Sequence, residues 1–363
     1  MRRRPPLTGS VPGGRCFRPW WFFSLLLLAG CQRTVVDSSA PDFHAQPAKL
    51  RSQPAGNPDV ELGMTFMNLS NPFFTSIRDV TLGLAETARI KVIVNGAEMD
   101  ASKQLDILQN YVEQKVSCIL LNPVDSAAVA AGVKAANAAK IPVVTFDVNA
   151  ASGTVDCFVE SNNRLAGQLC AETLGLRLNG RGKVIVLDHP TVTSVQERVA
   201  GFEEVLQRRF PGVKIIAKQE ANAALESGRR TMESLLTGYP QVDAVFAIND
   251  PCALGAAQAL VAAKRTDVFI VSIDGAPEAI DAIRQGGPLV CSVAQFPQEI
   301  GRVAFTSAQR IVRGASVPKH IRIPVMPVTK ETLADYPGWS GRVPAKMVVP
   351  WKTDLKLETL EEN

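Results

Sequence analysis

Two runs of sequence decide the fold, AVFAIN at 244–249 and FIVSID at 269–274. Each is an apolar run of the length of a buried strand, and the residues between them have the amphipathic pattern of a helix. The first run ends at Asn249 and the second ends at Asp274, 25 positions later. Together they predict a strand–helix–strand unit within a parallel sheet.

The same unit occurs in the first half of the chain. CILLN at 118–122 ends at Asn122 and VVTFD at 143–147 ends at Asp147, again 25 positions apart. Because ligands bind at the carboxyl edge of open parallel sheets, this repetition predicts a ligand site. The alternative for each residue taken alone is to cap the following helix, which Asn and Asp do well. The four matched strand ends favour the ligand site.

Short apolar runs and longer amphipathic runs alternate on both sides of these units, which predicts two α/β domains of similar build. In the first half the pattern predicts strands at 61–67, 90–95, 116–121, 141–146 and 155–160 and helices at 75–88, 101–114 and 126–139. In the second half it predicts helices at 163–178, 194–209, 225–237, 251–263, 277–285 and 297–313 and strands at 183–187, 213–217, 243–248, 268–273, 290–294 and 320–326.

The first 30 residues have the features of an export signal. They hold five arginines and no acidic residue, and their apolar run at 20–29 is too short to span a bilayer as a mature helix. The ending Leu28-Ala29-Gly30-Cys31 resembles the bacterial lipobox, in which the cysteine is lipidated and becomes the first residue. We therefore expect residues 1–30 to be a lipoprotein signal peptide and Cys31 to anchor the protein to the membrane of the cell envelope, in the periplasm. A plain signal peptide with an incidental cysteine is the alternative.

The charge of the chain is concentrated in this signal. The whole chain carries 39 Lys and Arg against 35 Asp and Glu, but without residues 1–30 the balance is 34 against 35. No basic patch remains to suggest a nucleic-acid partner. Residues 31–59, rich in proline and without apolar periodicity, are expected to form a flexible tether. The composition of the chain, 46% hydrophobic and 20% charged, is otherwise that of an ordinary folded protein.

Neither a cofactor nor a metal is expected. The sequence has no phosphate-binding loop of the GxxxxGK[ST] type and no GxSxG elbow, and its three histidines lie far apart. Without Cys31 and the signal, five cysteines remain, with no CxxC spacing, and most of them lie inside apolar runs. Buried free thiols are the favoured interpretation, with one disulfide as the alternative.

The polar strand ends suit a neutral ligand rich in hydroxyl groups, because carboxylates accept hydrogen bonds from hydroxyls and amides both donate and accept. In NPFF at 71–74, one ring is expected to pack inward and the other to cover the apolar face of a sugar ring. Two rings that only anchor the helix are the alternative. Arg198 is either an ordinary exposed helical arginine or a bidentate donor to aspartates and ligand oxygens.

A set of motifs resembles those of the periplasmic ribose-type sugar-binding proteins, in order and over residues 60–330. They are NPFF at 71–74, LNPVDS at 121–126, NDPCALGA at 249–256, IDG at 273–275 and AQ at 294–295. The resemblance implies the type I periplasmic binding protein fold, with two Rossmann-like α/β lobes whose parallel sheets are joined by a three-strand hinge. It implies a monomeric, non-enzymatic receptor that delivers a small neutral sugar or polyol to an ABC permease.

The resemblance also implies where the lobes and the site lie. The N-terminal lobe is expected at 60–161 plus 296–324, the C-terminal lobe at 162–295 plus 325–333 and a C-terminal extension at 334–363. The chain would cross between the lobes near 160–163, 294–297 and 323–326. The implied ligand-binding residues are Asn71, Phe73, Phe74, Asn122, Asp147, Arg198, Asn249, Asp274 and Gln295.

Three positions depart from the ribose pattern. Val148 replaces an arginine that follows the first cleft aspartate, Ala223 replaces a stacking aromatic and Met67 replaces a small polar residue. A roomier, less cationic pocket of this kind suits a hexose, a deoxy sugar or a polyol. Two alternatives to transport stay open: a sugar-sensing receptor for a membrane kinase or chemoreceptor, and a hydrolase or isomerase using Asp188 and His189.

Overall fold

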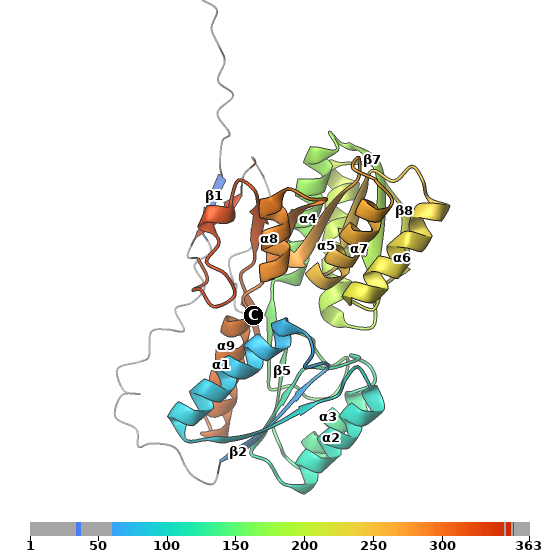
Figure 1. Ribbon diagram of the computed structural model, residues 1–363. Coiled ribbons are helices and arrows are strands. Elements are labelled where there is room, and N and C mark those ends of the chain that lie inside the picture. Colours follow the sequence, from blue (N-terminus) through green and yellow to red (C-terminus); the bar gives the residue numbers. More distant parts are fainter. Residues whose placement is uncertain (1–33, 38–59, 345, 350, 352–363) are drawn as a thin grey trace, which may run out of the picture.

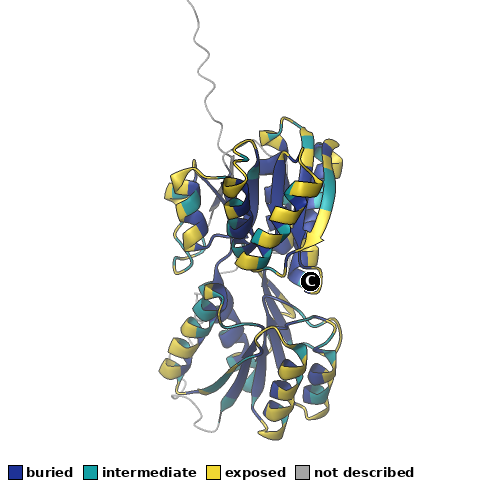
Figure 2. Ribbon diagram, turned by 45° about the vertical axis from the view of Figure 1, so that its right-hand side comes forward, coloured by how far each residue is buried: buried dark blue, intermediate teal, exposed yellow. Residues whose placement is uncertain are grey.

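A computed structural model describes residues 34–37, 60–344, 346–349 and 351 of the chain. Most of these residues form two lobes, each built on a six-stranded sheet with helices on both faces (Figure 1). The fold class expected from the sequence, two Rossmann-like α/β lobes, is confirmed. Figure 2 shows that the central strands of both sheets are buried, whereas an edge strand of the second lobe and the outer faces of the helices carry exposed residues.

The first lobe has a parallel sheet with the strand order β12-β6-β5-β4-β2-β3. Its strands are β2 (Glu61–Phe66), β3 (Lys91–Gly96), β4 (Cys118–Leu121), β5 (Val143–Phe146), β6 (Cys157–Ser161) and β12 (His320–Ile323). Its helices pack in two pairs, α1 (Pro72–Ala88) with α9 (Pro297–Val312) and α2 (Ala101–Glu113) with α3 (Ala130–Ala138). With helices on both faces, the inner strands of the sheet are buried and mostly apolar, whereas the edge strands β3 and β12 are partly exposed.

The second lobe has a sheet with the strand order β13-β11-β10-β9-β7-β8. Its strands are β7 (Arg181–Asp188), β8 (Gly212–Glu220), β9 (Ala244–Ala247), β10 (Phe269–Asp274), β11 (Leu289–Ala294) and β13 (Met326–Thr329). Helices α4 (Asn163–Arg177) and α5 (Thr193–Arg209) pack together, as do α6 (Leu225–Gly238) and α7 (Asp250–Ala262), and α8 (Pro277–Gln285) lies against β11.

Three connections join the lobes within residues 60–344. The chain leaves the first sheet after β6 to form α4, leaves the second sheet after β11 to form α9, and crosses again between β12 and β13. The last crossing lies near 323–326, as the resemblance implied, but the single strand predicted at 320–326 is wrong. Pro324 and Val325 instead separate two strands that belong to different sheets, and β13 pairs antiparallel with β11. An apolar run alone does not reveal such a change of sheet.

Two helix starts also differ from those predicted. The helix expected at 75–88 begins at Pro72, because the side chain of Asn71 accepts a hydrogen bond from the backbone of Phe73 and caps it. The helix expected at 126–139 begins at Ala130. The residues before it form turns, where Asp125 accepts hydrogen bonds from the N–H groups of Ala127 and Ala128.

The chain after β13 continues through a short 3₁₀ helix (Leu333–Asp335) to β14 (Lys346–Val349). There it pairs antiparallel with β1 (Thr34–Asp37), a strand inside the stretch that the sequence analysis interpreted as a flexible tether. The predicted signal peptide and Cys31 lie outside the described residues. Among the helices described, none has the length and apolar character needed to cross a bilayer. The five described cysteines are buried and free.

Candidate functional site

A cavity lies between the lobes, at the carboxyl ends of the strands. Both lobes line it, with Met67, Asn71, Phe73, Phe74, Asp147, Val148, His189, Val192, Ser194, Val195, Arg198, Ala223, Ile248, Asn249, Asp274 and Gln295. Eight of the nine residues that the sequence analysis selected are in this set, and Asn122 is the exception. The fold therefore brings together strand ends from two separate sheets.

Asp147 is the carboxylate that the first lobe places in the cavity. It follows β5 with its backbone in the left-handed region, at a φ of 61°. The fully buried Asn122 orients it, donating from Nδ2 to Asp147 Oδ2 at 3.2 Å and to the Phe146 carbonyl at 3.3 Å. The other amide atom, Oδ1, accepts from the Met67 N–H at 3.1 Å. Asn122 thus positions a cavity residue and does not itself line the cavity.

Burial raises the pKa of Asp147 from its ordinary value of 3.8 to about 7. The guanidinium of Arg198 and the hydrogen bond from Asn122 lower this pKa, whereas the carboxylates of Asp274 and Glu160 raise it. Near neutral pH the carboxyl is therefore close to the midpoint of its titration. Groups that donate hydrogen bonds to it stabilise its ionised form.

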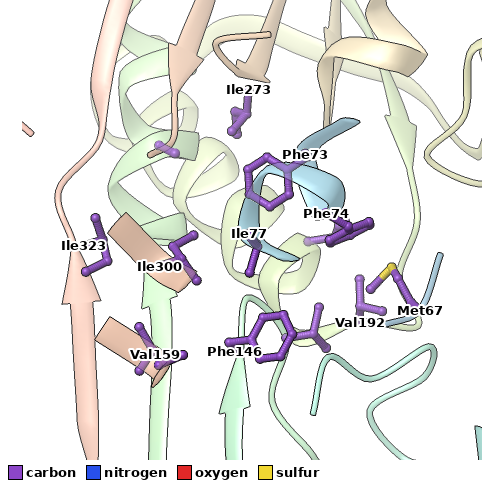
Figure 3. Close-up of a cluster of buried hydrophobic side chains, with 14 of the residues drawn as sticks. Met67, Phe73, Phe74, Ile77, Phe146, Val159, Val192, Ile273, Ile300 and Ile323 are labelled. Atoms are coloured by element: carbon purple, nitrogen blue, oxygen red, sulfur yellow. The ribbon is translucent and has the colours of Figure 1, made fainter. Parts of the chain in front are cut away.

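Two aromatic rings form most of the apolar surface of the first lobe at the cavity. Phe73 and Phe74, in the first turn of α1, are both buried and both line the cavity, with ring centroids 5.4 Å apart in an edge-to-face arrangement. Figure 3 shows Phe74 on the side of Met67 and Val192, with Phe73 above it. The sequence predicted that one ring packs inward and the other faces the cleft. In the structure each ring does both, because each is buried and each lines the cavity. Phe74 also packs against Phe66 of β2, with centroids 6.3 Å apart.

Arg198 of α5 is buried and organises the face contributed by the second lobe. Its Nε donates to Asn163 Oδ1 at 2.9 Å and its Nη1 donates to the Ile248 carbonyl at 2.7 Å. The same Nη1 lies 3.7 Å from Asp274 Oδ1. Of the two alternatives for this residue, the exposed helical arginine is wrong. Within the described residues its Nη2 makes no hydrogen bond, so it is available to a ligand oxygen.

Asp274, at the end of β10, is held between Arg198 and Gln295. Gln295 Nε2 donates to Asp274 Oδ1 at 2.8 Å. The Oε1 atom of Gln295 is buried without a hydrogen-bond partner among the described residues. Burial raises the pKa of Asp274, and Arg198 and Gln295 oppose that rise. The cluster thus offers an unmatched acceptor and a carboxylate to a ligand.

Asn249 has both of the roles that the sequence analysis weighed. Its Oδ1 accepts from the Cys252 N–H at 3.1 Å and caps α7, while its Nδ2 donates to the Ala223 carbonyl at 2.9 Å. The residue nevertheless lines the cavity. The equivalent residue in the first lobe, Asn122, caps no helix. Identical residues at matched strand ends therefore serve different purposes.

Asp250 lies behind this face and was missed by the sequence analysis. It is fully buried and accepts hydrogen bonds from Ser272 of β10, Ser292 of β11 and the Ala276 N–H. Ser292 in turn accepts from the Gly275 N–H at 2.9 Å. Burial and the Asp274 carboxylate raise the pKa of Asp250. This network ties together the strand ends that carry Asp274 and Gln295.

The cavity lining also includes residues before Arg198 on α5. Ser194 and Val195 precede Arg198 by four and three positions, which places all three on one face of the helix. Helical spacing from Arg198 was the signal that could have identified them.

Asp188 and His189, the residues on which an enzymatic interpretation depended, lie at the end of β7. Only His189 lines the cavity. Its Nδ1 is 3.2 Å from Glu220 Oε1 and its Nε2 is 3.3 Å from Thr191 Oγ1. Asp188 accepts a hydrogen bond from the backbone N–H of His189 at 2.7 Å. Both ring nitrogens therefore have partners within the second lobe. The described residues contain no group of His, Cys, Asp and Glu arranged to hold a metal ion.

Comparison with known proteins gives a consistent result. The family model described as "Periplasmic binding protein domain" matches residues 62–316. The ribose import binding protein of Bacillus subtilis is 33% identical over 303 residues, covering 83% of this chain and 94% of that protein. The xylitol-binding protein of Mycolicibacterium smegmatis is 30% identical over 285 residues, covering 77% of this chain and 80% of that protein.

Solved structures agree with these sequence relatives. A myo-inositol binding protein from Caulobacter, bound to myo-inositol, superposes with a TM-score of 0.73 at 27% identity and covers 78% of this chain and 97% of that one. A periplasmic solute-binding protein of an ABC transporter from Actinobacillus succinogenes, with bound D-allose, superposes with a TM-score of 0.71 at 26% identity and covers 76% of this chain and 100% of that one.

Proposed function

The chain belongs to the periplasmic binding protein family, among its ribose-type sugar-binding members, and from that premise we propose that it is the receptor of an ABC-type importer for a small neutral sugar or polyol. The receptor carries out no catalytic step. It binds its ligand between the lobes and delivers it to a membrane permease.

The observation that carries the proposal is the unmatched hydrogen-bonding capacity of the cavity. Asp147 and Asp274 present carboxylate oxygens from opposite lobes, Gln295 presents a buried Oε1 and Arg198 presents Nη2. A hydroxyl group donates one hydrogen bond and accepts others, so several hydroxyls on one ring satisfy such a mixed set. Phe73 and Phe74 cover the apolar C–H face of that ring.

The charge of the cavity supports a neutral ligand. Two carboxylates and one guanidinium face it, and burial raises the pKa of both carboxylates. An anionic ligand would lie against Asp147 and Asp274, which is unfavourable at close range in a buried site. The relatives named above bind ribose and xylitol, and the solved neighbours hold myo-inositol and D-allose, all of them neutral and hydroxyl-rich.

The positions that depart from the ribose pattern support a ligand other than ribose. Met67, Val148 and Ala223 all line the cavity. Val148 provides no guanidinium and Ala223 provides no second ring, so this pocket has fewer charged donors and less stacking surface than a ribose binder. We therefore infer a hexose, a deoxy sugar or a polyol as the ligand.

The proposal includes export and anchoring. Residues 1–30 act as a lipoprotein signal peptide, and the lipid on Cys31 holds the receptor on the membrane at the periplasm, next to its permease. Support comes from the lipobox-like sequence before Cys31 and from the excess of arginine ahead of it. Replacing Cys31 by Ser should move the protein from the membrane fraction to the soluble fraction of the cell envelope. Retention in the membrane fraction would contradict the anchor.

A thermal-shift panel tests the ligand class. D-Ribose, D-allose, xylitol and myo-inositol are compared, at sub-millimolar concentration, with the anionic analogue gluconate. We expect at least one neutral compound to raise the melting temperature and gluconate to have no effect, because binding to the native state alone stabilises it. If no neutral compound raises the melting temperature, even in a panel widened to other pentoses, hexoses and cyclitols, the proposed sugar or polyol ligand is wrong. Recovery of a chemically altered sugar from the protein would refute the non-catalytic role.

A further inference from the structure

The chain returns to the cleft after its last strand in the second lobe. Tyr336 donates from its hydroxyl to the carbonyl of Gly275 at 2.8 Å. Trp339 donates from Nε1 to the carbonyl of Asp274, also at 2.8 Å. Two side chains near the C-terminus thus bind two successive carbonyls of the turn that carries a cavity carboxylate. We refer to Tyr336 and Trp339 as the C-terminal brace.

The turn needs support because its backbone is strained. Asp274 has a φ of 140°, a conformation that L-residues rarely adopt, and Gly275 follows with a φ of 69°. Such a conformation persists only where the surroundings impose it. The Asp274 carbonyl accepts from both Trp339 and the N–H of Gln295, the latter at 3.0 Å. A Cβ at position 275 would lie 2.7 Å from the Tyr336 hydroxyl, so the brace closely covers the turn.

The brace also reaches the opposite lobe. The ring of Trp339 packs edge-to-face against Phe73, with centroids 5.7 Å apart and an interplanar angle of 81°. Phe73 begins α1 of the first lobe, whereas Asp274 ends β10 of the second. One indole therefore contacts a cavity-lining residue of each lobe. Separation of the lobes breaks the aromatic contact, while the hydrogen bond to Asp274 remains within the second lobe.

We propose that Trp339 is a positioning residue of the binding site, which fixes the Asp274 turn and stabilises the closed arrangement of the lobes through Phe73. Trp339 is not among the residues that line the cavity, so it acts on the ligand only through these two neighbours. The inference rests on the proposed function for its ligand and assigns a role to part of the C-terminal extension. The hydrogen bond from Trp339 fixes the turn that positions the Asp274 carboxylate. The contact between the Trp339 and Phe73 rings favours the closed arrangement of the lobes.

Affinity measurements on three variants test the role of each contact. Binding of D-ribose, D-allose, xylitol and myo-inositol is measured by calorimetry for the wild-type chain, W339A, W339F and W351A. W339F removes the N–H but keeps a ring, and should weaken binding by about threefold to tenfold. W339A removes both contacts, and should weaken binding by about tenfold or more. W351A removes the other tryptophan of the same segment, which is not among the residues that line the cavity, and should change affinity by less than about twofold.

A purely structural role would give a different result. If Trp339 only stabilised the fold, W339A and W351A would both lower the melting temperature and neither would change the affinity of the folded protein. That result would overturn the proposal, as would equal losses of affinity for W339A and W351A.

Small-angle X-ray scattering without sugar separates this inference from the proposed function. W339A should have a larger radius of gyration than W351A, because loss of the contact with Phe73 favours open lobes. If no sugar or polyol binds but this difference is present, the proposed function fails and the brace stands. If a sugar binds and the two variants have the same scattering and the same affinity, the brace fails and the proposed function stands.

Discussion

The two lobes line the same cavity with different kinds of side chain. The first lobe presents the rings of Phe73 and Phe74 and a single supported carboxylate, Asp147. The second lobe presents Arg198 and Asp274 within a connected set of buried hydrogen bonds that continues through Gln295 and Asp250. Under the proposed function, the first face covers the ligand and the second face sets its orientation.

The difference between the two faces indicates where binding and stability are coupled. Ring contacts are weakly directional and tolerate small shifts, so the first lobe is able to accommodate related ring shapes. A network of buried charges fails as a unit when one member is lost, because each remaining group is left without compensation. We therefore expect changes in the network of the second face to affect folding and binding together, and changes to the rings of the first face to affect mainly binding.

The largest effect is expected for Arg198→Ala. Its removal leaves Asp274 buried without its guanidinium and leaves Asn163 Oδ1 and the Ile248 carbonyl without a donor. We expect the free energy of unfolding to fall by about 3–5 kcal/mol, measured by urea denaturation, together with loss of sugar binding. Arg230→Ala is the control, since that side chain is 70% exposed in its ion pair and should change stability by less than about 1 kcal/mol. Similar values for the two variants would show that Arg198 does not stabilise the buried network of the second face.

The next-largest effect is a pH dependence of stability that comes from Asp147 on the first face. The pKa of Asp147 is raised from 3.8 to about 7, so the folded state retains its proton at pH values where the unfolded chain has lost it. The resulting stabilisation is complete below pH 4 and is lost as the pH rises through 7. A pKa shift of this size limits the loss in the free energy of unfolding to a few kcal/mol at most.

Asp147→Asn does not titrate, and so it tests this expectation. The melting temperature of the variant minus that of the wild type should increase steadily between pH 4 and pH 8 in the absence of sugar. Glu278→Gln, at an exposed position on α8, is the control and should give a constant difference. A difference for Asp147→Asn that is flat with pH would show that the carboxyl is not desolvated.

A smaller loss of stability is expected for Ser292→Ala, which alters the hydrogen bonds behind the second face. The change removes hydrogen bonds to Asp250 at 2.7 and 2.9 Å and leaves the Gly275 N–H without its acceptor. We expect a loss of about 1–3 kcal/mol in the free energy of unfolding. Thr145→Val is the counterpart on the first lobe, where one hydrogen bond to Asn149 is lost, and should cost about 1 kcal/mol. An equal or larger loss for Thr145→Val would reverse the comparison.

The smallest effect is expected for Phe74→Leu. Leucine keeps the residue apolar but removes the stacking surface and the edge-to-face contact with Phe73. Sugar binding should weaken by about 1 kcal/mol, or roughly fivefold, as measured by calorimetry. Leu82→Ala, at an exposed position on α1, controls for changes in the helix. An affinity loss above 100-fold would mean that the ring does more than cover the ligand.

Much of this arrangement was predictable because it depends on short, continuous stretches of sequence. Apolar runs of strand length, each ended by a polar residue, placed Asn122, Asp147, Asn249 and Asp274 at strand ends without any knowledge of contacts. The resemblance to known sugar receptors added Arg198 and Gln295, for which spacing alone gave no decision. The roles within the site were less predictable: Asn122 and Asn249 occupy matched positions, yet one orients a carboxylate and the other caps a helix.

Other features depend on residues distant in sequence. The strand predicted at 320–326 divides between two sheets because its neighbours, β6 and β11, belong to different lobes. Asp250 follows a predicted strand end, but its partners Ser272 and Ser292 come from later strands. Trp339 lies 65 positions from the carbonyl that it binds.

By itself, the sequence determined the alternation of strands and helices, the polar residues at the strand ends and the near-neutral charge that follows an arginine-rich N-terminal stretch. These are properties of composition and periodicity, which each segment carries without its partners. Only the tertiary structure decided which polar groups face the cavity, how far the pKa of Asp147 rises and how Trp339 reaches both lobes. The physical reason is that desolvation and buried hydrogen bonding depend on which distant segments the fold brings into contact.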